Sequence, residues 1–231
     1  NNNFFFRQYS LVVIFRPFLC LVPDNISIFV CLFFSIMFDS LKIHCQQTMA
    51  FSDAELAAVD HYFVERSFKR RDFLLEASHV CRHLFFVAKG CVRHFHIKED
   101  GSEATCDITL ENQWATDFVS FADETPSRLS LQALEDTVVY SVEKARLLEL
   151  YAAHHRFETF GRITTERVLQ RSIDTTMSLA SLKPEERFKH LMAVRPELLQ
   201  RVPQKHIASL LGISPESLSR LQKRMCDRRK T

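Results

Sequence analysis

The chain has 231 residues, of which 46% are hydrophobic and 25% are charged, and its formal net charge is +2. These values are ordinary for a globular protein and leave room for one large or two small domains. Seven cysteines without any Cys-x-x-Cys pair argue against a disulfide scaffold and against a compact zinc or iron–sulfur site, and they favour a reducing compartment.

Residues 1–48 differ from the rest of the chain, because Phe, Ile, Leu and Cys are concentrated there. The longest apolar run, at 26–38, has about 13 residues, whereas a membrane-spanning helix needs roughly 20. A secretory signal is not indicated, because the segment has no compact basic region at its start and no small-residue cleavage pattern before Met49. We expect Met49 to be the true start and 1–48 to be a non-native segment translated from upstream. A membrane-tethered sensor that uses this segment is the alternative.

From Met49 onward the pattern is that of a folded domain. Ser52 and Glu55 have the spacing of a capping box and predict a helix that runs to about residue 64. Residues 67–143 then alternate like strands, with a hairpin turn at the segment EDGS. Several short strands with turns between them predict a jelly-roll β-barrel, so that 49–143 form one domain with its N-terminal helix.

The apolar period returns to that of a helix after the barrel. The segment EKARLLELYAAH predicts a short helix, and residues from about 156 to 180 predict a long one. At about 1.5 Å per residue the long helix spans nearly 40 Å, which is longer than a helix that only covers a small barrel. We therefore expect 144–181 to be a linker and a dimerisation helix, which pairs with a second copy of itself.

Residues 182–231 carry the pattern of a helix-turn-helix. Pro203 can open a short helix that ends at Gly212, and Ser214 is a natural N-cap for a second helix. In that second helix, three apolar residues recur at helical spacing and must pack inward, namely Leu218, Leu221 and Met225. Positions 201–231 hold eight Lys or Arg and two Asp or Glu, and such a basic end indicates a polyanionic partner. A helical corner with a solvated cationic tail is the alternative.

The order of barrel, long helix and helix-turn-helix resembles the Crp/Fnr transcription regulators. The resemblance is carried by the segments FFVAKGCVRHFHIKEDGSE, LQALED and RVPQKHIASLLGISPESLSRLQK, which are most similar to the branch of the family common in Bacteroidetes. It implies an α+β chain with a cyclic-nucleotide-binding-type jelly roll, a dimerisation helix and a winged-helix DNA-binding domain. Little sequence follows the last helix, so we expect the wing to be short or missing.

The resemblance also implies which residues contact double-stranded DNA. Glu216 and Arg220 match the base-reading positions of the family pattern Ser-x-Glu-Thr/Ser-x-x-Arg. Arg220 can donate two hydrogen bonds to guanine, and Glu216 can accept one from cytosine. The other expected interface residues, mainly for phosphates, are Gln204, Lys205, Ser214, Ser217, Lys223 and Arg224.

The barrel departs from the cyclic-AMP-binding members, which hold the ribose and the cyclic phosphate with a Gly-Glu pair and an Arg-Ser pair. Here no Gly-Glu pair precedes the corresponding segment, and Pro126-Ser127-Arg128 replaces the Arg-Ser order. Ser127 and Arg128 are the candidates for binding an anionic ligand. We expect a small-molecule effector other than cyclic AMP, which the sequence does not identify, and no cofactor.

Two other functions are weighed against a DNA-binding regulator. His94-x-His96 could hold a metal in a cupin-like enzyme, but no third histidine with cupin spacing follows, so we expect neither a metal nor an enzyme. A family member that has lost DNA binding could act as a dimeric interaction module. We expect a dimeric, cytoplasmic, sequence-specific transcription regulator without a membrane partner.

Overall fold

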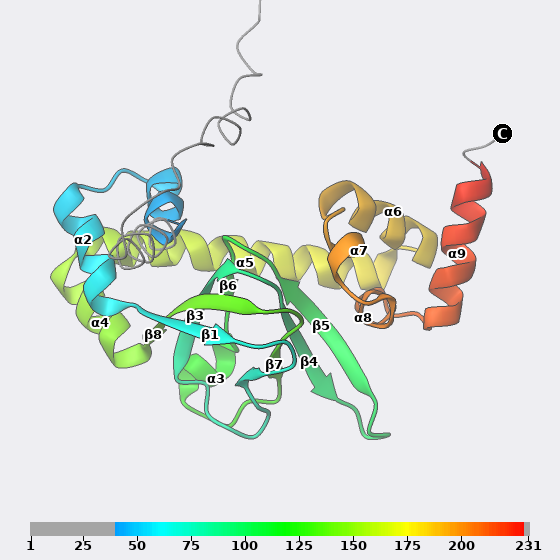
Figure 1. Ribbon diagram of the computed structural model, residues 1–231, viewed down its shortest axis with the longest axis horizontal. Coiled ribbons are helices and arrows are strands. Elements are labelled where there is room, and N and C mark those ends of the chain that lie inside the picture. The colour runs from blue at the N-terminus through cyan, green and yellow to red at the C-terminus, as the bar shows by residue number, and fades with distance from the viewer. Residues whose placement is uncertain (1–39, 229–231) are drawn as a thin grey trace, which may run out of the picture. The chain divides into compact units, whose positions relative to one another are not determined.

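The computed structural model describes residues 40–228, except for the side chains of 226–228. Within this range, eight strands form two four-stranded antiparallel sheets with the orders β1-β8-β3-β6 and β2-β7-β4-β5 (Figure 1). The strands are β1 (Val64–Phe68), β2 (Phe73–Leu75), β3 (His83–Lys89), β4 (Val92–Ile97), β5 (Glu103–Thr109), β6 (Trp114–Ala115), β7 (Ser130–Ala133) and β8 (Thr137–Glu143). Two such facing sheets make the expected jelly roll.

Helices precede and follow the barrel. They are α2 (Asp53–Tyr62), α3 (Phe118–Asp123), α4 (Lys144–Ala153), α5 (His155–Ser181), α6 (Pro184–Val194), α7 (Leu198–Arg201), α8 (Gln204–Leu210) and α9 (Pro215–Arg228). The long helix α5 runs from the barrel to the C-terminal helices (Figure 1). The predicted α+β fold class is confirmed, and α9 extends to Arg228, the last described residue. None of the helices in the described part of the chain is long and apolar enough to span a bilayer.

Local signals in the sequence account for most element boundaries. Ser52 accepts a hydrogen bond from the backbone of Glu55, whose carboxylate accepts one from the backbone of Ser52, and the capping box starts α2 as predicted. Gly101 has φ 78° in the turn between β4 and β5, where the predicted hairpin lies. The short helices α3 and α7 were not predicted. Asp117 caps α3 with bonds from Val119 and Ser120.

Most of the segment 1–48 lies outside the described residues, but its last part does not. Residues 40–48 are helical, and Leu41 and Cys45 on this helix are each 1% exposed. They belong to the same apolar cluster as Val59 on α2 and Phe86 on β3. The folded unit thus begins before Met49, which was the expected domain boundary. That residues 1–48 are a non-native segment stays a prediction.

Three apolar clusters hold this part of the chain together. One fills the barrel interior and includes Phe85, Val87, Leu131 and Val139. A second lies between the outer face of β3, β6 and β8 and the helices 40–48, α2, α4 and α5. The third joins the barrel to α6, α7, α8 and α9. The DNA-binding candidates therefore stand on a helical unit that shares a core with the barrel.

Candidate nucleic-acid interface

The helices α8 and α9 meet at a tight turn built on Gly212. Gly212 has φ 67°, a conformation that favours glycine. The turn is closed by two backbone bonds of 3.0 Å, from Gly212 N–H to the carbonyl of Ser209 and from Ile213 N–H to that of Ala208. This is the 6→1 closure of a Schellman motif. It ends α8 where the sequence predicts and turns the chain into α9.

The start of α9 is fixed by a cap and its inner face by leucines. Ser214 Oγ accepts a bond from the backbone N–H of Ser217 at 3.2 Å, as expected of an N-cap. Leu218 is 0% and Leu221 is 3% exposed, and Met225 packs against the same cluster. The predicted apolar stripe thus faces inward, and the opposite side of α9 faces solvent.

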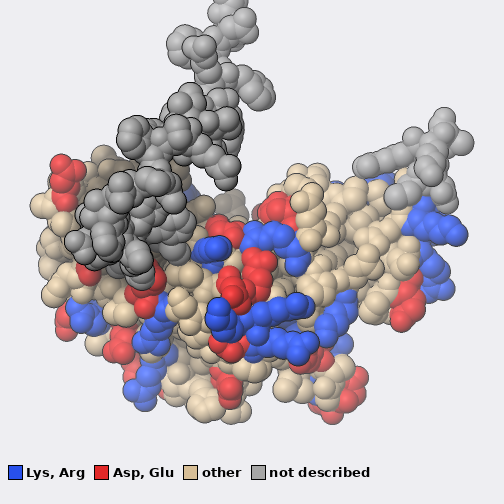
Figure 2. Space-filling view, viewed as in Figure 1, with Lys and Arg blue, Asp and Glu red and all other residues tan. Residues whose placement is uncertain are grey.

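The solvent side of this unit carries the predicted DNA contacts. Gln204, Lys205, Ser214, Glu216, Arg220, Lys223 and Arg224 are exposed, and Ser217 is half-buried. Figure 2 shows basic side chains over α9, which Figure 1 places at the right edge. The backbone N–H of Glu216, followed by Ser214 and Arg220, holds the pKa of the Glu216 carboxyl below its usual range. Arg220 Nη2 lies 3.5 Å from Ser217 Oγ.

The helix-turn-helix is docked on the barrel through β5. Ser209 Oγ on α8 accepts a 2.8 Å hydrogen bond from the backbone N–H of Thr105. Cys91, Ile108 and Leu110 of the barrel pack with the apolar residues of α6 to α9. This contact leaves the outer side of α9 uncovered by the described part of the barrel.

Ion pairs surround this apolar contact. Asp107 on β5 pairs with Arg171 on α5 at 3.0 Å and with Arg195 after α6 at 3.3 Å. Burial alone would raise the pKa of Asp107, but Arg171, and after it His94 and Arg195, outweigh burial and hold the pKa below its usual value. Figure 2 shows acidic and basic side chains alternating over the middle of the molecule.

A second set of pairs involves a residue that the sequence assigns to the basic tail. Arg201 on α7 bonds both oxygens of Glu111 at 2.7 Å and also pairs with Glu135. The charge of Arg201 is thus neutralised within the chain rather than offered to DNA. Sequence reasoning missed these residues because Arg201 and Glu111 are 90 positions apart.

The candidate ligand residues of the barrel do not form a joint anion site. The side chain of Ser127 is buried, and its hydroxyl donates to Asp117 Oδ2 at 2.6 Å and lies 2.8 Å from the carbonyl oxygen of Leu129. Arg128 next to it is exposed. A carboxylate at the Ser127 hydroxyl would repel a phosphate. Binding of an anion by Ser127 and Arg128 stays a prediction that this geometry does not favour.

The two histidines of the metalloenzyme alternative have different partners. His94 Nε2 is 2.8 Å from Thr109 Oγ1, and burial lowers the pKa of this imidazole to about 4. His96 Nδ1 is 3.2 Å from Cys106 Sγ on the neighbouring strand. No cluster of three or more His, Cys, Asp or Glu side chains suited to a metal occurs among the described side chains, those of residues 40–225.

Comparisons with known proteins agree with this architecture. Residues 65–154 match the family model of the cyclic nucleotide-binding domain. No curated protein sequence matches the chain at a significant level. The Bacteroidetes branch of the predicted resemblance stays a prediction.

Solved structures match over the barrel and the helices. FixK2 from Bradyrhizobium japonicum is 17% identical, with a TM-score of 0.60 over 72% of this chain and 85% of its own. The c-di-GMP responsive regulator CLP of Xanthomonas campestris is 18% identical, with a TM-score of 0.60 over 77% and 93%. A Crp/Fnr-family regulator from Eubacterium rectale is 12% identical, with a TM-score of 0.59 over 77% and 85%. Residues 65–154 therefore match the cyclic nucleotide-binding domain family, and the described chain has the fold of the solved Crp/Fnr-type regulators.

Proposed function

We propose that this protein is a dimeric, sequence-specific, DNA-binding transcription regulator. The observation that carries the proposal is the division of α9 into two faces. Its leucines are buried against α8 and the barrel, while Glu216, Arg220, Lys223 and Arg224 are exposed on the other side. A capped helix with an acidic and a basic side chain near its start suits the base edges of the major groove.

Dimerisation through α5 is the second part of the proposal. Leu169, Ile173 and Met177 recur every four residues on this helix, and their side chains are 59%, 52% and 59% exposed. An exposed apolar stripe along a helix is suited to pack against the same stripe of a second copy. A two-fold dimer would present two copies of α9 to two half-sites of a palindrome.

The barrel is proposed to act as the sensory domain of a cytoplasmic protein. The Asp117 carboxylate that accepts from Ser127 argues for an effector other than a cyclic nucleotide. An effector can shift the regulator only if it binds one arrangement of the dimer better than another.

DNA binding is tested by its dependence on salt. The binding constant of the full chain for duplex DNA should fall steeply as salt rises, because each neutralised phosphate adds about −0.9 to the logarithmic slope. Lys223→Ala should make this slope shallower by about one phosphate. Lys98→Ala is the control, because Lys98 is also exposed but lies in the β4–β5 hairpin. A chain without any measurable duplex binding at low salt would instead support the dimeric interaction module.

The dimer is tested separately from DNA binding. Ile173→Glu places a charge in the middle of the exposed α5 stripe and should convert the dimer to a monomer in analytical ultracentrifugation. Leu148→Glu is the control, because Leu148 on α4 is 56% exposed and lies outside the stripe. Equal sedimentation of the two variants would overturn the α5 interface.

A further inference from the structure

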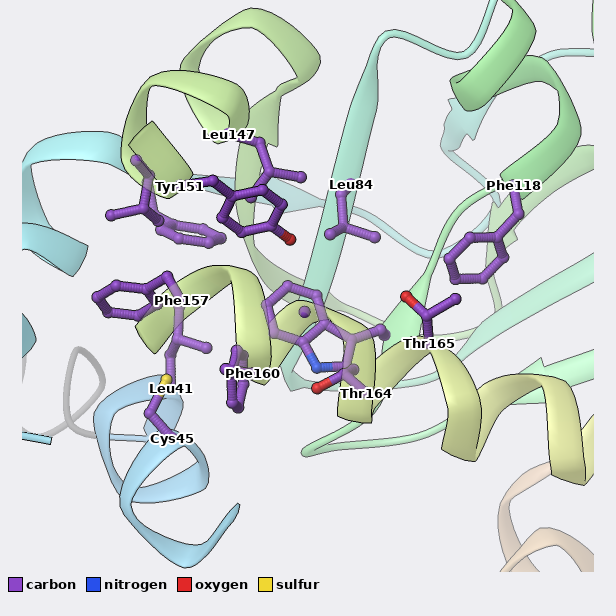
Figure 3. A pocket seen from close by; sticks show the side chains of 14 residues that line it. Leu41, Cys45, Leu84, Phe118, Leu147, Tyr151, Phe157, Phe160, Thr164 and Thr165 are labelled. Carbon is purple, nitrogen blue, oxygen red and sulfur yellow. The ribbon is translucent and has the colours of Figure 1, made fainter. Parts of the chain in front are cut away.

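The outer face of the barrel carries a cavity that none of the functions above uses. It measures about 40 Å³ and lies between the sheet of β3 and β6 and the helices 40–48, α4 and α5. Figure 3 shows side chains from each of these elements directed to one space, among them Leu41, Leu84, Tyr151 and Phe160. Its walls are mostly apolar and aromatic.

This cavity is distinct from the interior of the barrel. On β3, Phe85 and Val87 belong to the interior cluster, whereas Leu84 packs with the cluster under the helices. Neighbouring residues of a strand point to opposite faces of the sheet. The cavity lined by Leu84 is therefore on the helix side of the sheet, and neither Ser127 nor Arg128 lines it.

A larger and more polar cavity adjoins the first. It measures about 160 Å³ and shares Trp114 and Thr164 with the apolar cavity. An apolar cavity of about 150 Å³ is known to hold a benzene molecule. The larger cavity alone therefore has room for one aromatic ring, and the smaller cavity does not.

The polar cavity has an excess of positive charge. Arg171 at its wall is paired with Asp107. Arg167 at its wall donates to the hydroxyl of Thr48 at 3.2 Å, and no carboxylate among the described side chains, those of residues 40–225, pairs with it. Burial, and then Arg167, lower the pKa of His44, which also lines the cavity, so that its imidazole is neutral at pH 7. Of the described basic groups at this wall, Arg167 is therefore the one whose positive charge is not compensated, and this charge favours the binding of an anion.

Two buried polar atoms on the shared wall point to a ligand with acceptor atoms. The indole N–H of Trp114 and the hydroxyl of Thr164 are both buried, and neither has a hydrogen-bond partner in the described part of the chain. Trp114 as a whole is 5% exposed. A buried donor without a partner costs free energy, which a bound acceptor would recover.

We propose that the larger cavity, with the wall that it shares with the smaller one, is a binding site for a small aromatic carboxylic acid. Its carboxylate faces Arg167 and the donor atoms of Trp114 and Thr164, and its ring lies within the larger cavity beside Val168. Since α5 carries both Thr164 and Arg167, such a ligand would act on the helix that also carries the dimer stripe. That last consequence rests on the proposed function, whereas the binding itself does not.

Binding is tested on the full chain without DNA, with benzoate as the probe. Trp114 is the single tryptophan of the sequence, so its fluorescence reports on this wall alone. Benzoate should change the fluorescence in a saturable way and give the same dissociation constant in isothermal titration calorimetry. Acetate, which lacks the ring, and benzyl alcohol, which lacks the charge, should each bind at least tenfold more weakly. No saturable signal, or equal binding of all three compounds, would overturn the proposal.

Variants locate the site, with calorimetry as the readout. Trp114→Phe keeps a ring but removes the N–H donor and should weaken benzoate binding by about tenfold. Arg167→Gln should weaken it about threefold to fivefold, because Arg167 is exposed and its charge is screened. Arg162→Gln is the matched control on the same helix, since Arg162 lines neither cavity and pairs with Glu166. Equal affinities for Arg167→Gln and Arg162→Gln, or an unchanged affinity in Trp114→Phe, would place the ligand elsewhere.

Discussion

The helix over residues 40–48 should contribute measurably to the stability of the barrel. Leu41 is 1% exposed and packs in the cluster between α2, α4 and α5, whereas Ile43 on the same helix is 49% exposed. Leu41→Ala removes two buried methyl groups and a methine, together worth about 2.4 kcal/mol at roughly 0.8 kcal/mol each, and enlarges the cavity that Leu41 lines. The sum is about 3 kcal/mol of unfolding free energy. Ile43→Ala should change it by less than about 0.5 kcal/mol.

Urea unfolding of the full chain, followed by the fluorescence of Trp114, measures this difference. With an m-value of about 2 kcal/mol per M, Leu41→Ala should lower the midpoint by about 1 to 2 M, and Ile43→Ala should leave it nearly unchanged. The deletion of residues 1–48 should lower the midpoint at least as much as Leu41→Ala. Equal midpoints for the two point variants, together with an unchanged midpoint for the deletion, would refute the packing of this helix. That result would favour Met49 as the start of the folded protein.

Three further predictions concern the barrel and its docking face. Burial lowers the pKa of His94 to about 4, below the roughly 6.5 of an unfolded histidine. The unfolding free energy therefore has its full value above about pH 6.5 and falls by up to about 1.4 kcal/mol per pH unit toward pH 4. His94→Gln should flatten this slope in urea titrations at several pH values. His190→Gln is the control, because His190 is exposed, and it should keep the full slope. Asp107→Asn should lower the unfolding free energy by about 1 to 3 kcal/mol, because it leaves two partly buried arginines without their carboxylate; Asp60→Asn, at a more exposed pair, should cost less than about 1 kcal/mol. Gly90→Ala would put a Cβ 2.4 Å from Thr137 Oγ1 and should cost more than about 2 kcal/mol in thermal unfolding, whereas Gly101→Ala, with open space around its Cβ, should cost about 1 kcal/mol. Equal losses within either pair would contradict the packing described here.

Short-range signals explain why much of the fold could be predicted. The capping box of Ser52 and Glu55, the hairpin at Gly101 and the turn at Gly212 each depend on residues within a few positions of one another. The apolar period of α9 likewise follows from its own sequence, and it indicated that Glu216 and Arg220 are exposed.

Contacts between distant positions could not be predicted in the same way. Asp107 meets Arg195 across 88 positions, and from the sequence alone both read as ordinary surface charges. The short helix α3 was missed because six residues give no clear period, and its start depends on the side chain of Asp117. The burial of Leu41 and Cys45 was hidden by the unusual composition around them, since an apolar-rich segment indicates no particular partner.

The unpartnered atoms of Trp114 and Thr164 lie beyond sequence reasoning for a related reason. Trp114 is 5% exposed, which by itself is the burial of an ordinary packing residue. Only the three-dimensional arrangement shows that its N–H lacks a partner and that Thr164, 50 positions later, lies on the same wall.

The central claim is that α9 reads DNA as part of a dimer, and one selection experiment tests it most directly. The full chain and Arg220→Ala are each used to select bound duplexes from a random pool over a series of salt concentrations. We expect the unmodified chain to select a palindrome, and the variant to relax the preference at one guanine in each half-site. Identical sites selected by both proteins would contradict the role of Arg220, and the absence of any selected duplex at low salt would contradict DNA binding by this chain without an added effector.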